Sequence, residues 1–170
     1  MKWVLFTGTW KDTNEEVLND VREATREVLN RGDGIITGGA LGVDHACMDE
    51  VLRLGKETQL KVIIPTKLEV YIEHFHNAAH IGKILKTECE LLEASLRELY
   101  KRSPEAIIEL SFTEIKTRAE YFARNQAEVD IADEVYAFQV NDSVGTQDTI
   151  DKAIKKGVPI SVHKKYIIEV

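Results

Sequence analysis

The chain has 170 residues, of which 44% are hydrophobic and 30% charged, a composition typical of one globular domain rather than of a disordered segment. It carries 22 basic and 29 acidic residues, and its formal net charge of −7 disfavours broad contact with nucleic-acid phosphates, although a local basic groove could exist. No run approaches the roughly 18 apolar residues that cross a membrane, and the start lacks the pattern of a signal peptide. We therefore expect a cytoplasmic protein without membrane contact, in which Cys47 and Cys89 are reduced thiols.

The first third of the chain alternates between expected strands and helices. Apolar, β-prone runs predict strands over residues 3–7, 35–37 and 60–64. Apolar residues at helical spacing predict one helix that begins at a cap within residues 12–14 and ends at Gly32, and a second helix over residues 44–54. This β-α-β-α-β order predicts a parallel sheet with right-handed crossovers.

The following region departs from this alternation. Residues 68–102 have a helical composition and predict two helices that meet near Gly82. One apolar stripe recurs at steps of four and three residues, at Leu85, Cys89, Leu92, Leu96 and Leu99. This stripe could pack against the sheet or neighbouring helices, or it could form a dimer seam. The segment Ser103-Pro104-Glu105 predicts the start of another helix, with proline at its first position.

The last third returns to strands and helices. The sequence predicts a helix that ends at about residue 130, a strand over 134–140, a helix over 146–156, a strand over 159–162 and an edge strand over 166–170. No linker or internal repeat divides the chain. We therefore expect a single domain over residues 1–170, an α/β fold with a doubly wound, mostly parallel sheet of five or six strands and a helical insertion at about residues 66–115.

Three loops follow the carboxyl ends of the expected strands, where open parallel sheets bind their ligands. These loops combine glycines, small hydroxyl side chains and, in two cases, the first turn of a helix, which together can cradle a phosphate. The candidate phosphate-binding residues are Gly8, Thr9, Gly38, Gly39, Ala40, Gly42, Ser143, Gly145 and Thr146. Tight turns between strands and helices use the same residue types, so packing alone is the alternative.

Several single side chains allow both a functional and a structural interpretation. Arg124 could contact a phosphate through its guanidinium fork, or it could pair with one of the many acids. Asp44 could hold a ribose hydroxyl or cap its helix, and Trp10 could stack on a base or cover the core. One helix face carries possible metal ligands at Glu73, His76 and His80. Because a metal site needs three or four converging ligands, we expect a polar helix face there and no metal.

Two blocks of this sequence resemble the SLOG superfamily, which includes DNA-processing protein A. Residues 38–44 are similar to its Gly-Gly-Ala-x-Gly-hydrophobe-Asp turn. Its succession Arg-Asn … Asp … Ser-Gly-Thr … Ala … Gly is matched by Arg124, Asn125, Asp133, Ser143, Gly145, Thr146, Ala153 and Gly157. The resemblance covers most of the chain outside about residues 66–115. It implies a Rossmann-like fold that binds a nucleotide or a nucleotide-derived ligand next to Asp44, Arg124 and Asn125.

The branches of this superfamily differ in their chemistry. The cytokinin-activating phosphoribohydrolases carry Pro-Gly-Gly-x-Gly-Thr-x-x-Glu, and the related nucleoside deoxyribosyltransferases also need a Glu at that helical position. Aligning Gly145-Thr146 with this pattern puts Thr149 where the catalytic Glu belongs, and a threonine provides no carboxylate. A carboxylate could still come from another loop, through Asp44 or Asp142. The DNA-processing branch binds single-stranded DNA, which the acidic composition disfavours.

We therefore expect a protein that binds a nucleotide or sugar-phosphate ligand in a crevice at the carboxyl ends of the strands. One alternative is a nucleoside-monophosphate N-glycosidase, for which Arg124, Asp44 and Asp142 are the candidate catalytic residues. A second alternative is a module that binds single-stranded DNA. We expect no additional cofactor, and the amphipathic insertion favours a homodimer.

Overall fold

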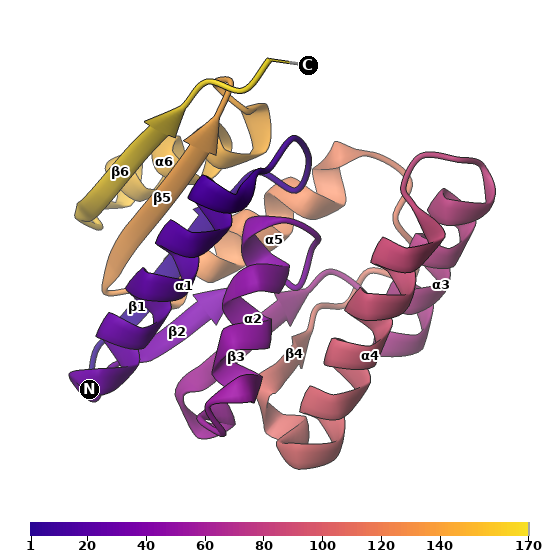
Figure 1. Ribbon diagram of the computed structural model, residues 1–170, viewed down its shortest axis with the longest axis horizontal. Coiled ribbons are helices and arrows are strands. Elements are labelled where there is room, and N and C mark those ends of the chain that lie inside the picture. The colour runs from indigo at the N-terminus through magenta and orange to yellow at the C-terminus, as the bar shows by residue number, and fades with distance from the viewer. Residues whose placement is uncertain (170) are drawn as a thin grey trace.

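The computed structural model describes residues 1–169 and consists of a parallel sheet between two layers of helices (Figure 1). The elements follow the order β1 (Trp3–Gly8), α1 (Glu15–Asn30), β2 (Gly34–Thr37), α2 (Val43–Arg53), β3 (Leu60–Ile64), α3 (Leu68–His80), α4 (Lys86–Arg102), β4 (Ile107–Glu109), α5 (Arg118–Ile131), β5 (Glu134–Val140), α6 (Val144–Lys156) and β6 (Ile160–Tyr166). Two 3-10 turns, η1 (Glu57–Gln59) and η2 (Pro104–Ala106), precede β3 and β4.

The sheet has the strand order β4-β3-β2-β1-β5-β6, and every pair of neighbours is parallel. The chain therefore builds outward from β1 in one direction and then returns to continue on the other side with β5. In β1, Val4 is aligned with Ile35 of β2 on one side and with Glu134 of β5 on the other. This reversal makes the gap beyond the carboxyl ends of β1 and β5 the topological switch point, where ligands bind in open α/β sheets.

Each face of the sheet packs against its own set of helices. On one face, side chains such as Val4 and Phe6 form a core with residues of α1, α2, α3 and α4. On the other face, Leu5 and neighbouring side chains of the central strands pack against Val129 of α5 and Ile150 of α6. Burial on both faces explains why the central strands read as continuous apolar runs rather than as alternating patterns. The Rossmann-like, doubly wound arrangement is thus confirmed.

The predicted helix at Pro104 is wrong. Only the short turn η2 forms there, and β4 follows it directly. Ile107 and Ile108 align with Val62 and Ile63 of β3. Pairing with a strand that would otherwise be the sheet edge outweighs the local helix-start signal, because helical preference is weak beside tertiary contacts. The insertion therefore contributes a strand as well as two helices.

The predicted edge strand over residues 166–170 is also wrong. A single strand, β6, runs from Ile160 to Tyr166, and residues 167–169 are in no strand, while Val170 lies outside the described residues. The sixth strand is instead β4, at the opposite edge of the sheet. The expectation of two helices around Gly82 is confirmed by α3 and α4.

The apolar stripe of α4 packs inside the chain. Cys89, Leu92, Leu96 and Leu99 are buried in the core shared with α2 and α3, whereas Leu85 is 65% exposed. The stripe is therefore a packing surface and not a dimer seam.

Cys47 is also a buried free thiol, and its burial raises its pKa to about 12. Within residues 1–169, no helix combines the length and apolar character that a membrane crossing requires.

Candidate functional site

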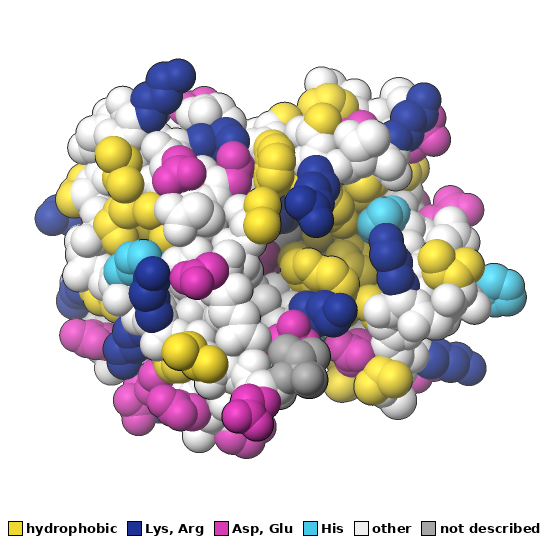
Figure 2. All heavy atoms as spheres, turned by 90° about the horizontal axis from the view of Figure 1, so that it is seen from above, with side chains coloured by type: hydrophobic (Ala, Val, Ile, Leu, Met, Phe, Trp, Pro, Cys, Tyr) yellow, Lys and Arg dark blue, Asp and Glu magenta, His cyan; other side chains and the backbone are white. Residues whose placement is uncertain are grey.

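A pocket of about 650 Å³ opens beyond the carboxyl ends of β1 and β5, at the switch point of the sheet. Figure 2 shows it as a hollow with apolar side chains inside and Lys and Arg side chains around its rim. The loop after β1, the start of α2, the helix α5 and the first turn of α6 form the side nearest the sheet. The opposite side comes from α3, the α3–α4 connection and the segment that leads into α5. The insertion thus contributes to one side of the pocket.

The structure brings most of the predicted binding residues to this pocket. Its lining includes Gly8, Thr9, Ala40, Asp44, Arg124, Asn125, Ser143, Gly145 and Thr146. Four predicted residues are not in the lining: Gly38, Gly39, Gly42 and Asp142. Asp142 points to solvent with its side chain 85% exposed, 3.5 Å from Lys165 Nζ. It offers no carboxylate to the pocket.

The three glycines of the β2–α2 turn allow close packing beneath the pocket. A Cβ on Gly42 would lie 2.3 Å from the Thr9 carbonyl oxygen, and the φ of 72° there also favours glycine. A Cβ on Gly38 would lie 2.3 Å from Arg124 Nη1, and one on Gly39 would lie 2.8 Å from Val62. These positions let the turn pass directly against the β1 loop, the Arg124 guanidinium and the core. The three glycines therefore act by allowing close packing beneath the pocket floor.

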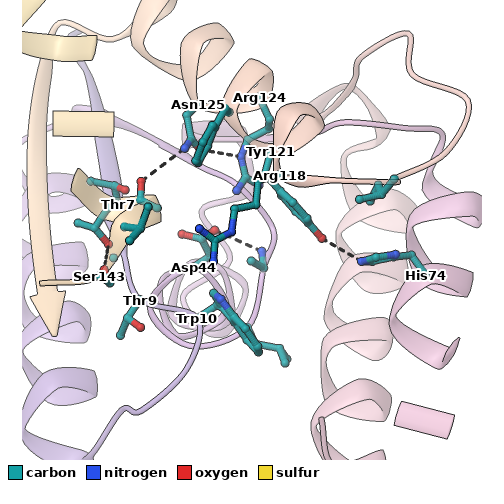
Figure 3. A pocket seen from close by; sticks show the side chains of 18 of the residues that line it. Thr7, Thr9, Trp10, Asp44, His74, Arg118, Tyr121, Arg124, Asn125 and Ser143 are labelled. Atoms are coloured by element: carbon teal, nitrogen blue, oxygen red, sulfur yellow. Dashed lines mark hydrogen bonds between the residues drawn. The ribbon is translucent and has the colours of Figure 1, made fainter. Parts of the chain in front are cut away.

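Arg124 lies at the centre of this floor and is only 8% exposed. Its Nε donates to Asn125 Oδ1 at 3.2 Å (Figure 3) and lies 3.3 Å from Glu128 Oε1, and its Nη1 donates to the Gly38 carbonyl oxygen at 2.6 Å. The guanidinium also lies 5.3 Å from the centre of the Tyr121 ring. Asp44 is buried in the same cluster and accepts a hydrogen bond from the Ala40 amide at 3.3 Å. The Arg124 charge is thus already engaged by protein groups.

Glu128 is a pocket residue that the sequence did not reveal. It is 3% exposed, and it forms no hydrogen bond within residues 1–169 apart from its ion contact with Arg124. Burial raises its pKa to about 8 even though Arg124 opposes the shift. Burial also raises the pKa of Asp44, again against the effect of Arg124. The i, i+4 spacing of Arg124 and Glu128 on a helix was the available signal.

The first turn of α6 presents backbone donors to the pocket. Within residues 1–169, the amides of Val144, Gly145 and Thr146 have no hydrogen-bond acceptor, and no acidic side chain lies in this turn. Ser143 Oγ donates to Thr146 Oγ1 at 2.6 Å instead of capping the helix. Asn125 holds the turn from α5, since its Nδ2 donates to Asp148 Oδ2 at 3.0 Å. A 13-residue helix thus begins with unpaired amides and its positive dipole end at the pocket.

Thr149 does not reach the pocket. Its side chain is buried, and Oγ1 donates back to the Gly145 carbonyl oxygen at 3.4 Å. The helical position that carries a catalytic Glu in the phosphoribohydrolase pattern therefore has only a packing role here.

The charge of the pocket differs from the charge of the chain. Its lining contains four cationic side chains, from Lys83, Lys116, Arg118 and Arg124, and two acidic ones, from Asp44 and Glu128. The whole sequence has an excess of acids and a net charge of −7. The pocket is therefore a positive region on an acidic molecule, and it favours a negatively charged ligand.

Aromatic and aliphatic side chains form the walls. Trp10 stands at the pocket with 48% of its surface exposed, and Tyr121 and Phe122 line the α5 side. Phe75 and Ile84 come from the insertion. Figure 3 shows Trp10 and Tyr121 on different sides of the space into which Arg118 points. Such walls can accommodate a planar ring.

The suggested metal ligands on α3 do not converge. His76 Nε2 lies 2.7 Å from Glu93 Oε1 of α4, so this side chain links the two insertion helices. Among the described residues, no three His, Cys, Asp or Glu side chains are grouped as a metal site would require.

Comparisons with known proteins identify the fold. No protein-family model and no curated protein matches the sequence. The structure is similar to that of DNA processing protein A from Helicobacter pylori, for which a single-stranded DNA binding mode is described, with a TM-score of 0.66 and 18% identity over 98% of this chain and 64% of that one. It is also similar to the molybdenum cofactor carrier protein from Chlamydomonas reinhardtii, with a TM-score of 0.56 and 17% identity over 94% of this chain and 73% of that one.

DNA processing protein A from Streptococcus pneumoniae has the same fold, with a TM-score of 0.60 and 18% identity over 99% of this chain and 50% of that one. The present chain thus spans half to two thirds of the length of the two DNA processing proteins. All three structures share the fold of this chain, so the Rossmann-like fold that the sequence resemblance implied is confirmed.

Proposed function

From this SLOG-type fold and the pocket at its switch point, we propose that the protein binds a nucleotide or a nucleotide-derived small molecule. One observation carries the proposal: on a chain with a net charge of −7, the pocket lining is cationic and includes helix amides that have no acceptor within residues 1–169. Its volume of about 650 Å³ lies in the range usual for small-molecule sites.

The first turn of α6 is the proposed phosphate site. The Val144, Gly145 and Thr146 amides and the positive helix end suit an anion, and no acid in that turn competes for them. A Cβ on Gly145 would have no neighbour within 4 Å, so the space beside this turn is open. Arg124 adds positive charge to the floor, where its Nη1 already donates to the Gly38 carbonyl oxygen and its Nε to Asn125 Oδ1.

The pocket lining also contains side chains that suit the base and the ribose of a nucleotide. Trp10 and Tyr121 provide ring faces on which a base can stack. Asp44 lines the pocket near the floor and can accept a hydrogen bond from a ribose hydroxyl through the oxygen that the Ala40 amide does not use.

Calorimetric titration with a panel of nucleotides and ribose phosphates tests this function. We expect at least one member to bind and Gly145→Asp to weaken that binding by about tenfold or more, because a carboxylate at the turn repels the phosphate. Gly145→Asn is the matched control of similar size without the charge. Since Asp favours the first turn of a helix, Gly145→Asp should not lower the melting temperature. Absence of binding to every compound, or equal binding by both variants and the wild type, would contradict the proposal.

Hydrolysis of an N-glycosidic bond is the second candidate function. The observation that favours it is the presence of two buried carboxyl groups, Asp44 and Glu128, in the pocket lining. With its raised pKa, Glu128 can donate a proton to a departing base while Asp44 stays near the sugar. Water and a nucleoside monophosphate would give the free base and ribose 5-phosphate. Chromatography of the released base decides the question, and a protein that releases none at high concentration has no such activity.

A further inference from the structure

Within residues 1–169, Arg118 is a cation without a protein partner. It is the first residue of α5 and lines the pocket, and Figure 3 shows its side chain pointing into the open space. Every other arginine within residues 1–169 forms an ion pair with a carboxylate. Arg118 forms neither an ion pair nor a hydrogen bond in that part of the chain. On a chain with more acids than bases, an unpaired arginine at a pocket suits an anion from outside.

Lys83 is a second such cation and belongs to the far end of the pocket. It lies in the α3–α4 connection, lines the pocket and has no ion pair within residues 1–169. Burial and the nearby charge of Lys83 both lower the pKa of His74, which places Lys83 on the His74 side. Figure 3 shows His74 and Ser143 on opposite sides of the pocket. Lys83 is thus separated from the α6 turn by the width of the pocket.

The pocket floor around Arg124 does not provide an anion site of its own. Arg124 already donates through Nη1 to the Gly38 carbonyl oxygen and through Nε to Asn125 Oδ1, and the carboxyl groups of Asp44 and Glu128 lie beside it. An anionic group would be repelled there by any ionised carboxylate. The pocket therefore offers an anion the amides of the α6 turn and, elsewhere in its lining, the cations Arg118 and Lys83, with the carboxyl groups of Asp44 and Glu128 in its floor.

We propose that the pocket selects a ligand with two separated anionic groups, one on the α6 turn and the other held by Arg118 and Lys83. Nucleoside 3′,5′-bisphosphates and dinucleotides belong to this class. The proposal rests on nucleotide binding by this pocket and adds the charge pattern of the ligand. Arg118 and Lys83 are then specificity-determining residues that the insertion and its exit segment add to the fold.

Paired titrations test the proposal, each comparing a nucleoside 5′-monophosphate with the corresponding 3′,5′-bisphosphate. We expect the bisphosphate to bind about tenfold more tightly, the effect of one charge-assisted contact. Arg118→Gln and Lys83→Gln should remove this advantage and change the affinity for the monophosphate by about twofold at most. Lys101→Gln is the matched control, because Lys101 is an exposed cation at the end of α4 that does not line the pocket.

The outcomes separate this inference from the function on which it rests. If the monophosphate binds and the bisphosphate binds no more tightly, the second anion site does not exist, whereas nucleotide binding stands. Equal weakening of both ligands by Arg118→Gln also overturns the inference, since it would mean a single shared anion site. If neither ligand of any pair binds, both proposals fail. Affinity that keeps rising with oligonucleotide length, beyond the bisphosphate, would replace the small ligand with single-stranded nucleic acid.

Discussion

Glu128 is the residue through which pH should act most directly on the fold. Its pKa of about 8 in the folded protein exceeds the value of 4.5 for an unperturbed Glu. The folded state therefore keeps a proton that the unfolded state has lost, and this group's contribution to stability declines as pH rises from about 4.5 to about 8. Glutamine copies the protonated form at any pH.

We expect Glu128→Gln to become more stable relative to the wild type as pH rises, by about 1.4 kcal/mol per pH unit between about pH 5 and about pH 7. Denaturant unfolding of both proteins across this pH range measures the difference between their free energies of unfolding. The contributions of the other titrating groups cancel in this difference. Glu23→Gln is the control, because Glu23 is exposed and forms no ion pair within residues 1–169. Parallel stability curves for Glu128→Gln and the wild type would show that Glu128 is ionised in the folded state.

Two glycines next to the pocket should respond to alanine in opposite ways. At Gly42, a Cβ would overlap the Thr9 carbonyl oxygen at 2.3 Å and would stand at a positive φ. We expect Gly42→Ala to lower the free energy of unfolding by about 3 kcal/mol, since backbone cannot move aside as a flexible side chain can. Gly145→Ala enters open space and should change stability by about 0.5 kcal/mol at most. Thermal unfolding compares them, and similar losses would contradict these two roles.

At the scale of elements, α4 is a core helix, and Leu96 tests this role. Leu96 is fully buried on the face that packs against the rest of the chain. We expect Leu96→Ala to cost about 2–5 kcal/mol of stability through the lost contacts and the cavity. Light scattering should show the same oligomeric state as for the wild type. A change in that state without a loss of stability would instead indicate a seam between two copies. The homodimer itself stays a prediction, no longer supported by this stripe.

Elements with strong local patterns could be predicted from the sequence, and elements defined by a distant partner could not. The apolar run of β3 and the glycine stop of α6 are visible in short windows. By contrast, β4 has three residues and exists because β3 offers it an edge. The residues just before it contain a helix-start signal at Pro104 that tertiary contacts override.

The candidate site divides in the same way. The sequence pointed to Gly145 because it lies in a loop at a strand end, and to Asn125 because it belongs to the Arg-Asn pair of the family resemblance. Arg118 and Lys83 were missed because a single cation in a polar loop carries no signal until the fold places it at a pocket. The sequence also could not show that Arg124 is already engaged, since the Gly38 carbonyl oxygen it contacts is a backbone atom 86 positions away.

At the scale of the whole molecule, the charge distribution limits binding to long nucleic acids. The rim supplies Lys83, Lys116 and Arg118, whereas the molecule as a whole is acidic. If single-stranded DNA binds at all, we expect at most about three phosphate contacts and a slope of log affinity against log salt no steeper than about −2. Fluorescence titrations in a salt series measure this slope. A much steeper slope would reveal a basic path beyond the pocket and favour the DNA-binding alternative.

The position of β1 between β2 and β5 has a consequence for how the protein is made. During synthesis, β1 emerges before the other strands of the sheet, yet its partner strand β5 begins at Glu134, which leaves the ribosome far later. Until then β1 has an open edge of unpaired amides and carbonyls beside Val4, Leu5 and Phe6, the kind of surface that recruits chaperones or other nascent chains. The α6 turn emerges later still. A ligand that needs this turn can therefore protect only chains that have been translated beyond it.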